Sequence, residues 1–432
     1  MPTRISSPTS NRFRVTTALV ALALIGMVPC SEGRASGSPP AARIGRVALW
    51  YNKRPPAPEE EILFRHAEIV LIGYPGTLDP WWRGLRKRGI KVLPYVSFYK
   101  LPNVADVPET NDWDGGSPAR SELARNPFWR EVSTDEHPEW IARDDTGKAK
   151  RPFDNDGYME GWNQSRPDLP SYREACQRGI QALMRQGYDG VFIDNVREAH
   201  QKMVVDAANL VHSLESDALV VMNGHADDQV NRAVNCRMLE SFIYSWAWDL
   251  GFFQRAEWQD YWKKMKDQAW EPGSGAQPLA LGYLGFSGRS AREDAYTLLS
   301  SALILGFAFS DAGTALDPSM VAAFARKNLF QGGTRSALQY FTGTSHDSWV
   351  GEFYSVNLGA PRGRLMEQNG CVVRYFARGL CVFNPTGQLA RVSLEWPGKF
   401  AYEAACGTRI ESRNGQITLY VAPFSGRVAL IT

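Results

Sequence analysis

The sequence predicts an α/β fold, a (β/α)8 TIM barrel with a C-terminal antiparallel β-sandwich domain. Short apolar runs alternate with helical segments between residues 46 and 310, which is typical of a parallel sheet covered by helices on both faces. After about residue 355 the pattern changes to short alternating strands separated by Gly, Asn and Pro. The 432 residues are enough for both parts.

The expected barrel strands share an apolar, often β-branched composition. In chain order they are RVALWY (46–51), EIVLIGY (68–74), KVLPYVSF (91–98), GVFIDN (190–195), LVVMNG (219–224), RMLESFIY (237–244), PLALGYL (278–284) and ALILGFAFS (302–310). The segment 171–187 predicts an intervening helix, because its apolar residues recur at helical spacing and Gly187 ends the pattern. The run 302–310 is equally compatible with a buried helix.

The N-terminal residues 1–35 have the composition of a secretory signal peptide. Basic residues precede an apolar run from Val15 to Val28, which is shorter than the roughly 20 residues that cross a bilayer. No other run is long enough, so no transmembrane segment is predicted and a secreted or periplasmic protein is expected. The surroundings of Cys30 partly resemble a lipoprotein cleavage box, which makes a membrane anchor at Cys30 the alternative to full release.

The rest of the chain divides into a flexible leader at 36–44, a catalytic barrel at 45–350 and a sandwich at 355–432. Without residues 1–35 the chain carries 44 Lys and Arg against 45 Asp and Glu, since four basic residues and one acidic residue are lost. This balance excludes the basic surface that a nucleic-acid-binding protein needs.

Five cysteines lie beyond the signal peptide. Their number is compatible with two alternatives: one or two disulfides, or buried thiols. Their spacing indicates no metal site, and no cofactor is expected. The five are Cys176, Cys236, Cys371, Cys381 and Cys406.

The strand at 190–195 ends in Asp194 and Asn195, although it otherwise has the composition of core. TIM-barrel enzymes present their catalytic groups at the C-terminal ends of the strands, so Asp194 is a candidate catalytic carboxylate. The alternative is a helix cap, because Glu198 follows Asn195 at the spacing of a capping box. If Asn195 forms the cap, Asp194 stays available for chemistry.

A second carboxylate is expected because cleavage of a glycosidic bond needs two. Glu240 lies in the otherwise apolar run at 237–244, where an ionised side chain is costly without a partner. A salt bridge to Arg237 is the structural alternative. Strands four and six face each other across part of the barrel mouth, so Asp194 and Glu240 can flank a sugar ring. A separation of about 5–5.5 Å would imply retention, and one of about 6.5–9.5 Å would imply inversion.

Sugar binding also needs aromatic platforms and polar groups, and residues of both kinds follow the expected strands. Two long, tryptophan-rich connections, at about 99–170 and 245–277, are expected on the same face. The predicted substrate-binding residues are Tyr51, Asn52, Tyr74, Tyr95, Asn195, Asn223, His225, Trp246, Tyr283 and Asp311.

Three segments carry a resemblance to a known family: HPEWIARDDTGK (137–148), GYDGVFIDN (187–195) and RMLESF (237–242). Over residues 45–355 the chain resembles hypothetical bacterial glycoside hydrolases with a TIM barrel, related to the endo-α-1,4-galactosaminidase type. The resemblance implies that Asp194 is the nucleophile and Glu240 the acid/base. The sandwich resembles the β-domain appended to many glycosidases.

The expected function is therefore that of a secreted glycoside hydrolase, retaining in mechanism, which cleaves an α-linked polysaccharide or oligosaccharide. A non-catalytic carbohydrate-binding barrel involved in polysaccharide handling is the alternative. A polysaccharide-assembly scaffold, with the sandwich as its interaction surface, is a third interpretation.

Overall fold

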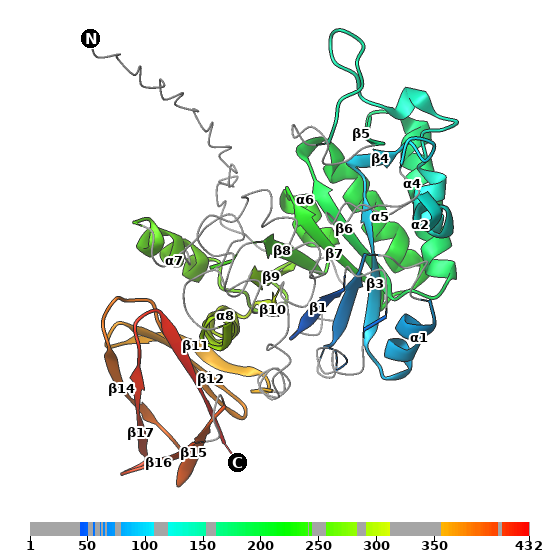
Figure 1. Cartoon of the computed structure of the whole chain (residues 1–432). Coiled ribbons are helices and arrows are strands. Elements are labelled where there is room, and N and C mark those ends of the chain that lie inside the picture. Colours follow the sequence, from blue (N-terminus) through cyan, green and yellow to red (C-terminus); the bar gives the residue numbers. More distant parts are fainter. Residues whose placement is uncertain are drawn as a thin grey trace, which may run out of the picture. The chain divides into compact units, whose positions relative to one another are not determined.

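The first part of the chain folds into a sheet of parallel strands surrounded by helices (Figure 1). In chain order, which is also the order in the sheet, the strands are β1 (Val47–Trp50), β2 (Ile69–Ile72), β3 (Lys91–Ser97), β6 (Gly190–Val196), β7 (Leu219–Gly224), β8 (Cys236–Glu240), β9 (Gln277–Gly282) and β10 (Ala308–Asp311). An isolated parallel bridge between Arg46 and Phe309 joins the two ends of the sheet. The predicted TIM barrel is confirmed.

This computed structural model describes residues 44–50, 55–56, 61, 64, 67–73, 79–107, 120–152, 161–240, 242–243, 256–282, 291–311, 356–404 and 408–431. The helices around the barrel are α1 (Asp79–Lys87), α4 (Pro170–Arg185), the 3-10 turn η3 (Glu198–His200), α5 (Gln201–Leu214), α6 (Asp228–Ala233), α7 (Trp258–Asp267) and α8 (Ala291–Leu305).

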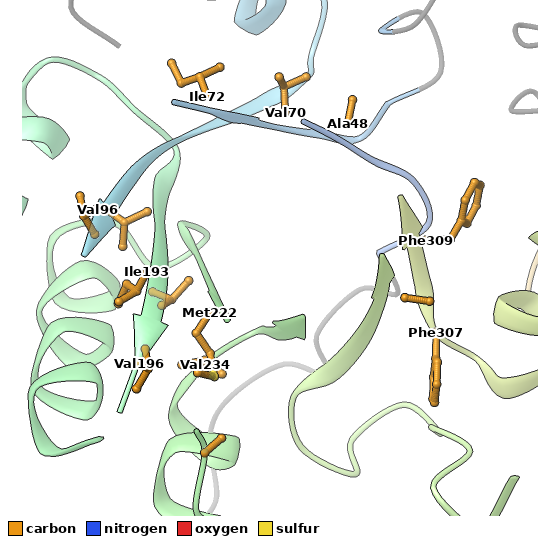
Figure 2. Close-up of a cluster of buried hydrophobic side chains, with 14 of the residues drawn as sticks. Ala48, Val70, Ile72, Val96, Ile193, Val196, Met222, Val234, Phe307 and Phe309 are labelled. Atoms are coloured by element: carbon orange, nitrogen blue, oxygen red, sulfur yellow. The ribbon is translucent and has the colours of Figure 1, made fainter. Parts of the chain in front are cut away.

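Alternate residues of the barrel strands belong to two separate cores. Val96, Ile193 and Met222 point outward into the layer between strands and helices, as Figure 2 shows. Leu93, Phe192 and further residues, nearly all of them from the strands, form a second buried cluster. This cluster fills the barrel interior. The residue two positions further along each strand therefore faces the same interior, closer to the C-terminal rim.

The expected eighth strand at 302–310 is partly wrong. Residues up to Leu305 complete α8, and after Gly306 and Phe307 the chain enters β10 at Ala308. Helix and strand are both fully buried here, so the apolar run has no polar face that could reveal its period. The sixth strand also ends earlier than expected, at Glu240, which places that carboxylate at the rim.

The long connection after β3 is ordered where it is described. It contains β4 (Lys100–Pro102), α2 (Arg120–Arg125), α3 (Pro127–Glu131), the 3-10 turn η2 (Pro138–Trp140) and β5 (Trp162–Gln164). β4 and β5 pair in an antiparallel ladder. Trp129 and Trp162 are buried against each other with ring centroids 5.1 Å apart, so these tryptophans of the connection pack rather than bind sugar.

The C-terminal part forms the predicted antiparallel sandwich. Its larger sheet has the order β11 (Pro361–Gln368), β12 (Cys371–Phe376), β13 (Gly379–Asn384), β18 (Ser425–Leu430), β15 (Phe400–Glu403), β16 (Arg409–Glu411), and the smaller sheet pairs β14 (Ala390–Glu395) with β17 (Gln416–Val421). Val373, Leu394 and Leu419 are members of the core between the sheets.

Hydrogen bonds link α8 directly to the sandwich. The Cys381 thiol donates to the Ser300 carbonyl (3.3 Å), and the buried Arg374 guanidinium donates to the Ile304 carbonyl (2.9 Å). The predicted domain limits, 45–350 and 355–432, stay predictions because residues 312–355 lie outside the described part of the chain.

The described cysteines are buried thiols: Cys176, Cys236, Cys371 and Cys381. Burial raises the pKa of the Cys371 thiol to about 11 and that of Cys176 to about 12, so these side chains act as small apolar groups. Cys406, Cys30 and the expected signal peptide lie outside the described residues. Within the described ranges, no helix is long and apolar enough to cross a bilayer.

Candidate active site

Asp194 lies near the end of β6 and faces the barrel interior. Phe192, two residues earlier, belongs to the interior core, and strand alternation places Asp194 above it at the C-terminal rim. The parallel ladder between β3 and β6 pairs Ser97 with Asp194, which fixes the height of the carboxylate on the barrel wall. The side chain is half-buried.

Asn223 holds the corresponding interior position on the next strand, β7, two residues after Val221. Its side-chain nitrogen Nδ2 donates a hydrogen bond to Asp194 Oδ1 at 2.9 Å and another to Glu240 Oε2 at 2.8 Å. One amide group therefore joins the two carboxylates that the sequence singled out.

Glu240 is the last residue of β8 and the most exposed of these three side chains. Met238, two residues before it, belongs to the barrel interior, so Glu240 also faces the mouth. Arg237 lies three residues before Glu240, so its side chain faces the opposite side of the strand, which disfavours the alternative of a salt bridge between them. The hydrogen bond between Glu240 and Asn223 shows that the Glu240 carboxylate lies at the barrel mouth instead of pairing with Arg237.

Asn195 does not cap a helix, so that expectation is wrong. The next helical turn, η3, has Arg197 at its N-cap position without a side-chain cap bond. Asn195 instead takes a positive φ of 57°, a left-handed conformation that Asn tolerates better than most residues. Its Nδ2 donates to the Tyr95 hydroxyl at 3.2 Å and to Asp194. Asn195 thus orients Asp194 instead of ending a helix.

Lys100 is a charged group at this rim that the sequence analysis missed. It is the first residue of β4, and its Nζ lies 5.5 Å from the centroid of the Tyr95 ring. Burial lowers the pKa of Lys100, while the charges of Asp194 and Glu240 act in the opposite direction. The sequence does contain a signal for this residue, because a lysine directly after the apolar strand 91–98 lies near the rim of the barrel.

Arg197 brings a second positive charge to the same side of the mouth. Its guanidinium carbon lies 4.9 Å from the centroid of the Tyr99 ring, and its charge adds to the lowering of the Lys100 pKa. The Tyr99 hydroxyl donates to the Pro152 carbonyl at 2.6 Å, which ties this wall of the mouth to the connection after β3.

The other predicted binding residues have different outcomes. The backbone N–H of His225 donates to the Val196 carbonyl at 2.8 Å, directly after β7. Asp311 ends β10, where it pairs with Gly282, as expected for a strand-end residue. Five predicted residues lie outside the described part of the chain: Tyr51, Asn52, Tyr74, Trp246 and Tyr283.

The described residues offer no metal site. Among them, no three His, Cys, Asp or Glu side chains are grouped so that they could hold an ion. The described polar groups at the mouth are carboxylates, amides, a phenol, an ammonium and a guanidinium, which are suited to proton transfer and to hydrogen bonding with hydroxyl groups.

The TIM barrel, with paired carboxylates at the C-terminal ends of its strands, has the construction of a glycoside hydrolase. The chain belongs to hypothetical glycosyl hydrolase family 15, which residues 110–380 match. The resemblance to hypothetical glycoside hydrolases is therefore confirmed. No curated protein matches the chain, and the predicted relation to the endo-α-1,4-galactosaminidase type stays a prediction.

Solved glycoside hydrolase structures share the whole fold at low sequence identity. An Anoxybacillus α-amylase is 11% identical with a TM-score of 0.55, and the match covers 90% of this chain and 98% of the amylase. The maltogenic α-amylase AmyB of Thermotoga neapolitana is 10% identical with a TM-score of 0.57, over 90% and 99%. A debranching enzyme of Nostoc punctiforme is 11% identical with a TM-score of 0.54, over 92% and 100%.

Proposed function

We propose that this glycoside hydrolase cleaves the O-glycosidic bonds of an α-linked polysaccharide or oligosaccharide with retention of configuration. Asp194 is the nucleophile and Glu240 the acid/base. The observation that carries the proposal is the double hydrogen bond from Asn223 Nδ2 to Asp194 and to Glu240. It brings two carboxylates from different strands to the same part of the barrel mouth.

The shared donor limits the separation of the two acids. The two bonded oxygens lie 2.9 and 2.8 Å from one nitrogen and are therefore less than about 6 Å apart. This is compatible with the carboxyl separation of about 5–5.5 Å in retaining enzymes, whereas inverting enzymes keep their carboxyl groups about 6.5–9.5 Å apart to admit a water molecule. The geometry therefore favours direct attack by one carboxylate.

The burial of the two acids favours the assignment of their roles. Asp194 is half-buried and oriented by two amides, as a nucleophile with a fixed approach to the anomeric carbon requires. Glu240 is exposed and can exchange protons with solvent. In the first step Asp194 bonds to the anomeric carbon while Glu240 protonates the departing oxygen, and in the second Glu240 removes a proton from the water that releases the sugar.

The names of proteins with the same fold support an α-linked substrate. Two are α-amylases, one is a debranching enzyme and one is an α-glucosyl transfer enzyme. We therefore place α-glucans first among the substrates to be tested.

The test is an activity screen of the purified chain on α-glucans and other glycans, followed by NMR of the first-formed anomer. Asp194→Asn and Glu240→Gln should each lower kcat by about 10³-fold or more without changing the thermal midpoint. Asp206→Asn, in an exposed ion pair on α5, is the matched control and should keep full activity. A 2-fluoro glycoside should label Asp194. An inverted product, or full activity of Asp194→Asn, would overturn the proposal.

We also propose export through residues 1–35, with either release or a lipid anchor at Cys30. The apolar run from Val15 to Val28 and the basic residues before it support export. N-terminal sequencing of the mature chain tests this proposal. A start at Cys30 with an attached lipid indicates an anchor, a start near residue 36 indicates release, and an intact Met1 in the exported fraction contradicts both.

A further inference from the structure

We propose that Lys100 is a positioning residue of the mouth, whose ammonium stabilises the negative charge of the nucleophile Asp194. This inference rests on the proposed function, because it assigns to Lys100 an effect on that nucleophile. It adds a residue from the connection after β3, outside the barrel strands that supply Asp194, Asn223 and Glu240.

The backbone of Lys100 is fixed by the β4–β5 ladder. Lys100 pairs with Gln164, and Gln164 is itself held on its other side, where its N–H donates to the Lys150 carbonyl and its carbonyl accepts from the Ala142 N–H, both at 2.8 Å. Leu101, the next residue, is fully buried. Lys100 is therefore part of an ordered wall rather than an exposed tail.

The side chain of Lys100 reaches the layer that holds the carboxylates. Its Nζ lies 5.5 Å from the centre of the Tyr95 ring, and Tyr95 faces the barrel interior two residues after Leu93. The Tyr95 hydroxyl accepts from Asn195, which also donates to Asp194. A chain of direct contacts thus leads from the Lys100 ammonium to Asp194.

The charges around Lys100 come from three elements. Asp194 on β6 and Glu240 on β8 attract the ammonium, whereas Arg197 after β6 repels it. Electrostatic coupling is mutual, so the ammonium favours ionised Asp194 by the same free energy by which ionised Asp194 favours the protonated lysine. Burial makes the largest contribution and lowers the pKa of Lys100. Lys100 is therefore charged at low pH and loses its charge as the pH rises through this lowered pKa.

The experiment compares Lys100→Met with Lys100→Arg across the pH–activity profile. Lys100→Met removes the charge and keeps most of the apolar stem, so kcat/KM should fall about 10-fold or more, with the larger loss on the acidic limb of the profile. Lys100→Arg keeps the positive charge, so the acidic limb should stay in place. An equal loss of activity at every pH in Lys100→Met would overturn the inference.

A second readout is independent of turnover. In NMR titrations of 13Cε-labelled lysine, the Lys100 signal is the one that Lys100→Met removes, and its pKa should fall further in Asp194→Asn and in Glu240→Gln. The exposed Lys202 on α5 serves as the internal control. An unchanged Lys100 titration in both variants overturns the coupling alone. If the Lys100 pKa responds to both substitutions but the chain hydrolyses no glycan, the electrostatic coupling is supported and the proposed function is overturned.

Discussion

Asn223 and Asp194 are joined by a 2.9 Å hydrogen bond although 29 positions separate them in the sequence. The contact exists because β6 and β7 are neighbours in the parallel sheet and both side chains face the barrel interior at the rim. The next strand, β8, adds Glu240 to the same amide. Three consecutive barrel strands thus supply one residue each, so the relative position of these residues depends on the spacing of the strand ends.

The first prediction concerns the amide of Asn223. Asn223→Ala should lower kcat/KM by about 10- to 100-fold, because hydrogen bonds to charged groups contribute about 1.5–3 kcal/mol and both carboxylates lose one. Asn223→Asp should lower it further, since a third negative charge would lie between the other two. Steady-state kinetics of both variants checks this. Asn209→Ala, on the exposed side of α5, is the control, and equal kinetics for Asn223→Asp and the parent would contradict the prediction.

The second prediction concerns the backbone next to Asn223. Gly224 has a φ of +123°, and a Cβ at this position would lie 2.4 Å from the Val196 carbonyl oxygen, a backbone atom of β6. Gly224→Ala should therefore push the ends of β6 and β7 apart and separate Asn223 from Asp194. We expect kcat/KM to fall by about 10²-fold, because small misplacements of reacting groups have effects of this size.

Gly147→Ala provides the matched control for this substitution. Gly147 also has a positive φ, +82°, but no atom lies within 4 Å of the added Cβ. It should lose about 1 kcal/mol of stability from backbone strain alone and keep full activity. If both alanine variants lose activity equally, the effect is not caused by the clash at the strand ends.

The rim positions of Asp194 and Glu240 could be predicted from the sequence because two simple rules apply to them. Each follows an apolar run, and parallel barrels present the C-terminal ends of their strands at one face. The strand period then aims both side chains inward, since Phe192 and Met238 are interior residues. Local pattern and global fold give the same answer at these positions.

The roles of Lys100 and Asn195 could not be predicted from the sequence because they depend on tertiary contacts. Lys100 is held by β5, a three-residue strand far along the chain with no periodic pattern of its own. Asn195 fits a capping box by spacing, but its backbone turns to a positive φ and aims the amide at Tyr95. In the folded barrel, the Asn195 side chain donates hydrogen bonds to Tyr95 and Asp194 instead of capping the helix.

The third prediction concerns pH and the buried imidazole of His200. Its Nε2 lies 2.8 Å from Ser165 Oγ, and Ser165 donates to the Phe98 carbonyl, so the imidazole donates to the serine. Burial, reinforced by the charge of Arg197, lowers the pKa of His200 to about 4. An unfolded histidine titrates near 6.5, so the folded state loses about 3 kcal/mol of stability as the pH falls from about 6.5 to 4.

Urea unfolding of the parent and of His200→Gln at pH 7, 5.5 and 4 measures this loss. His200→Gln is expected to be less stable at pH 7, because it loses packing, but to lose less stability on acidification. Ser165→Ala keeps the imidazole and should retain the acid sensitivity of the parent. Parallel pH dependences for the parent and His200→Gln would rule out His200 as the source.

The fourth prediction concerns the contact between α8 and the sandwich. The Tyr296 hydroxyl donates to the buried Glu403 carboxylate of β15 and accepts from the Val428 N–H at 2.6 Å. Tyr296→Phe leaves both groups without this partner and should destabilise the chain by about 2–4 kcal/mol, since each unsatisfied buried group costs about 1–3 kcal/mol. The urea midpoint measures this. The exposed Tyr420→Phe is the control and should be neutral.

Glu403 adds a pH dependence of the opposite sign to that of His200. Burial raises the pKa of Glu403, against the effects of Tyr296 and Arg427. The stability that this carboxyl contributes is therefore fully present at acidic pH and is lost as the pH rises through its raised pKa. Glu403→Gln cannot ionise, so it should gain stability relative to the parent as the pH rises, while kcat/KM stays unchanged because the barrel mouth is untouched. A constant stability difference from acidic to neutral pH would show that Glu403 does not titrate in this range.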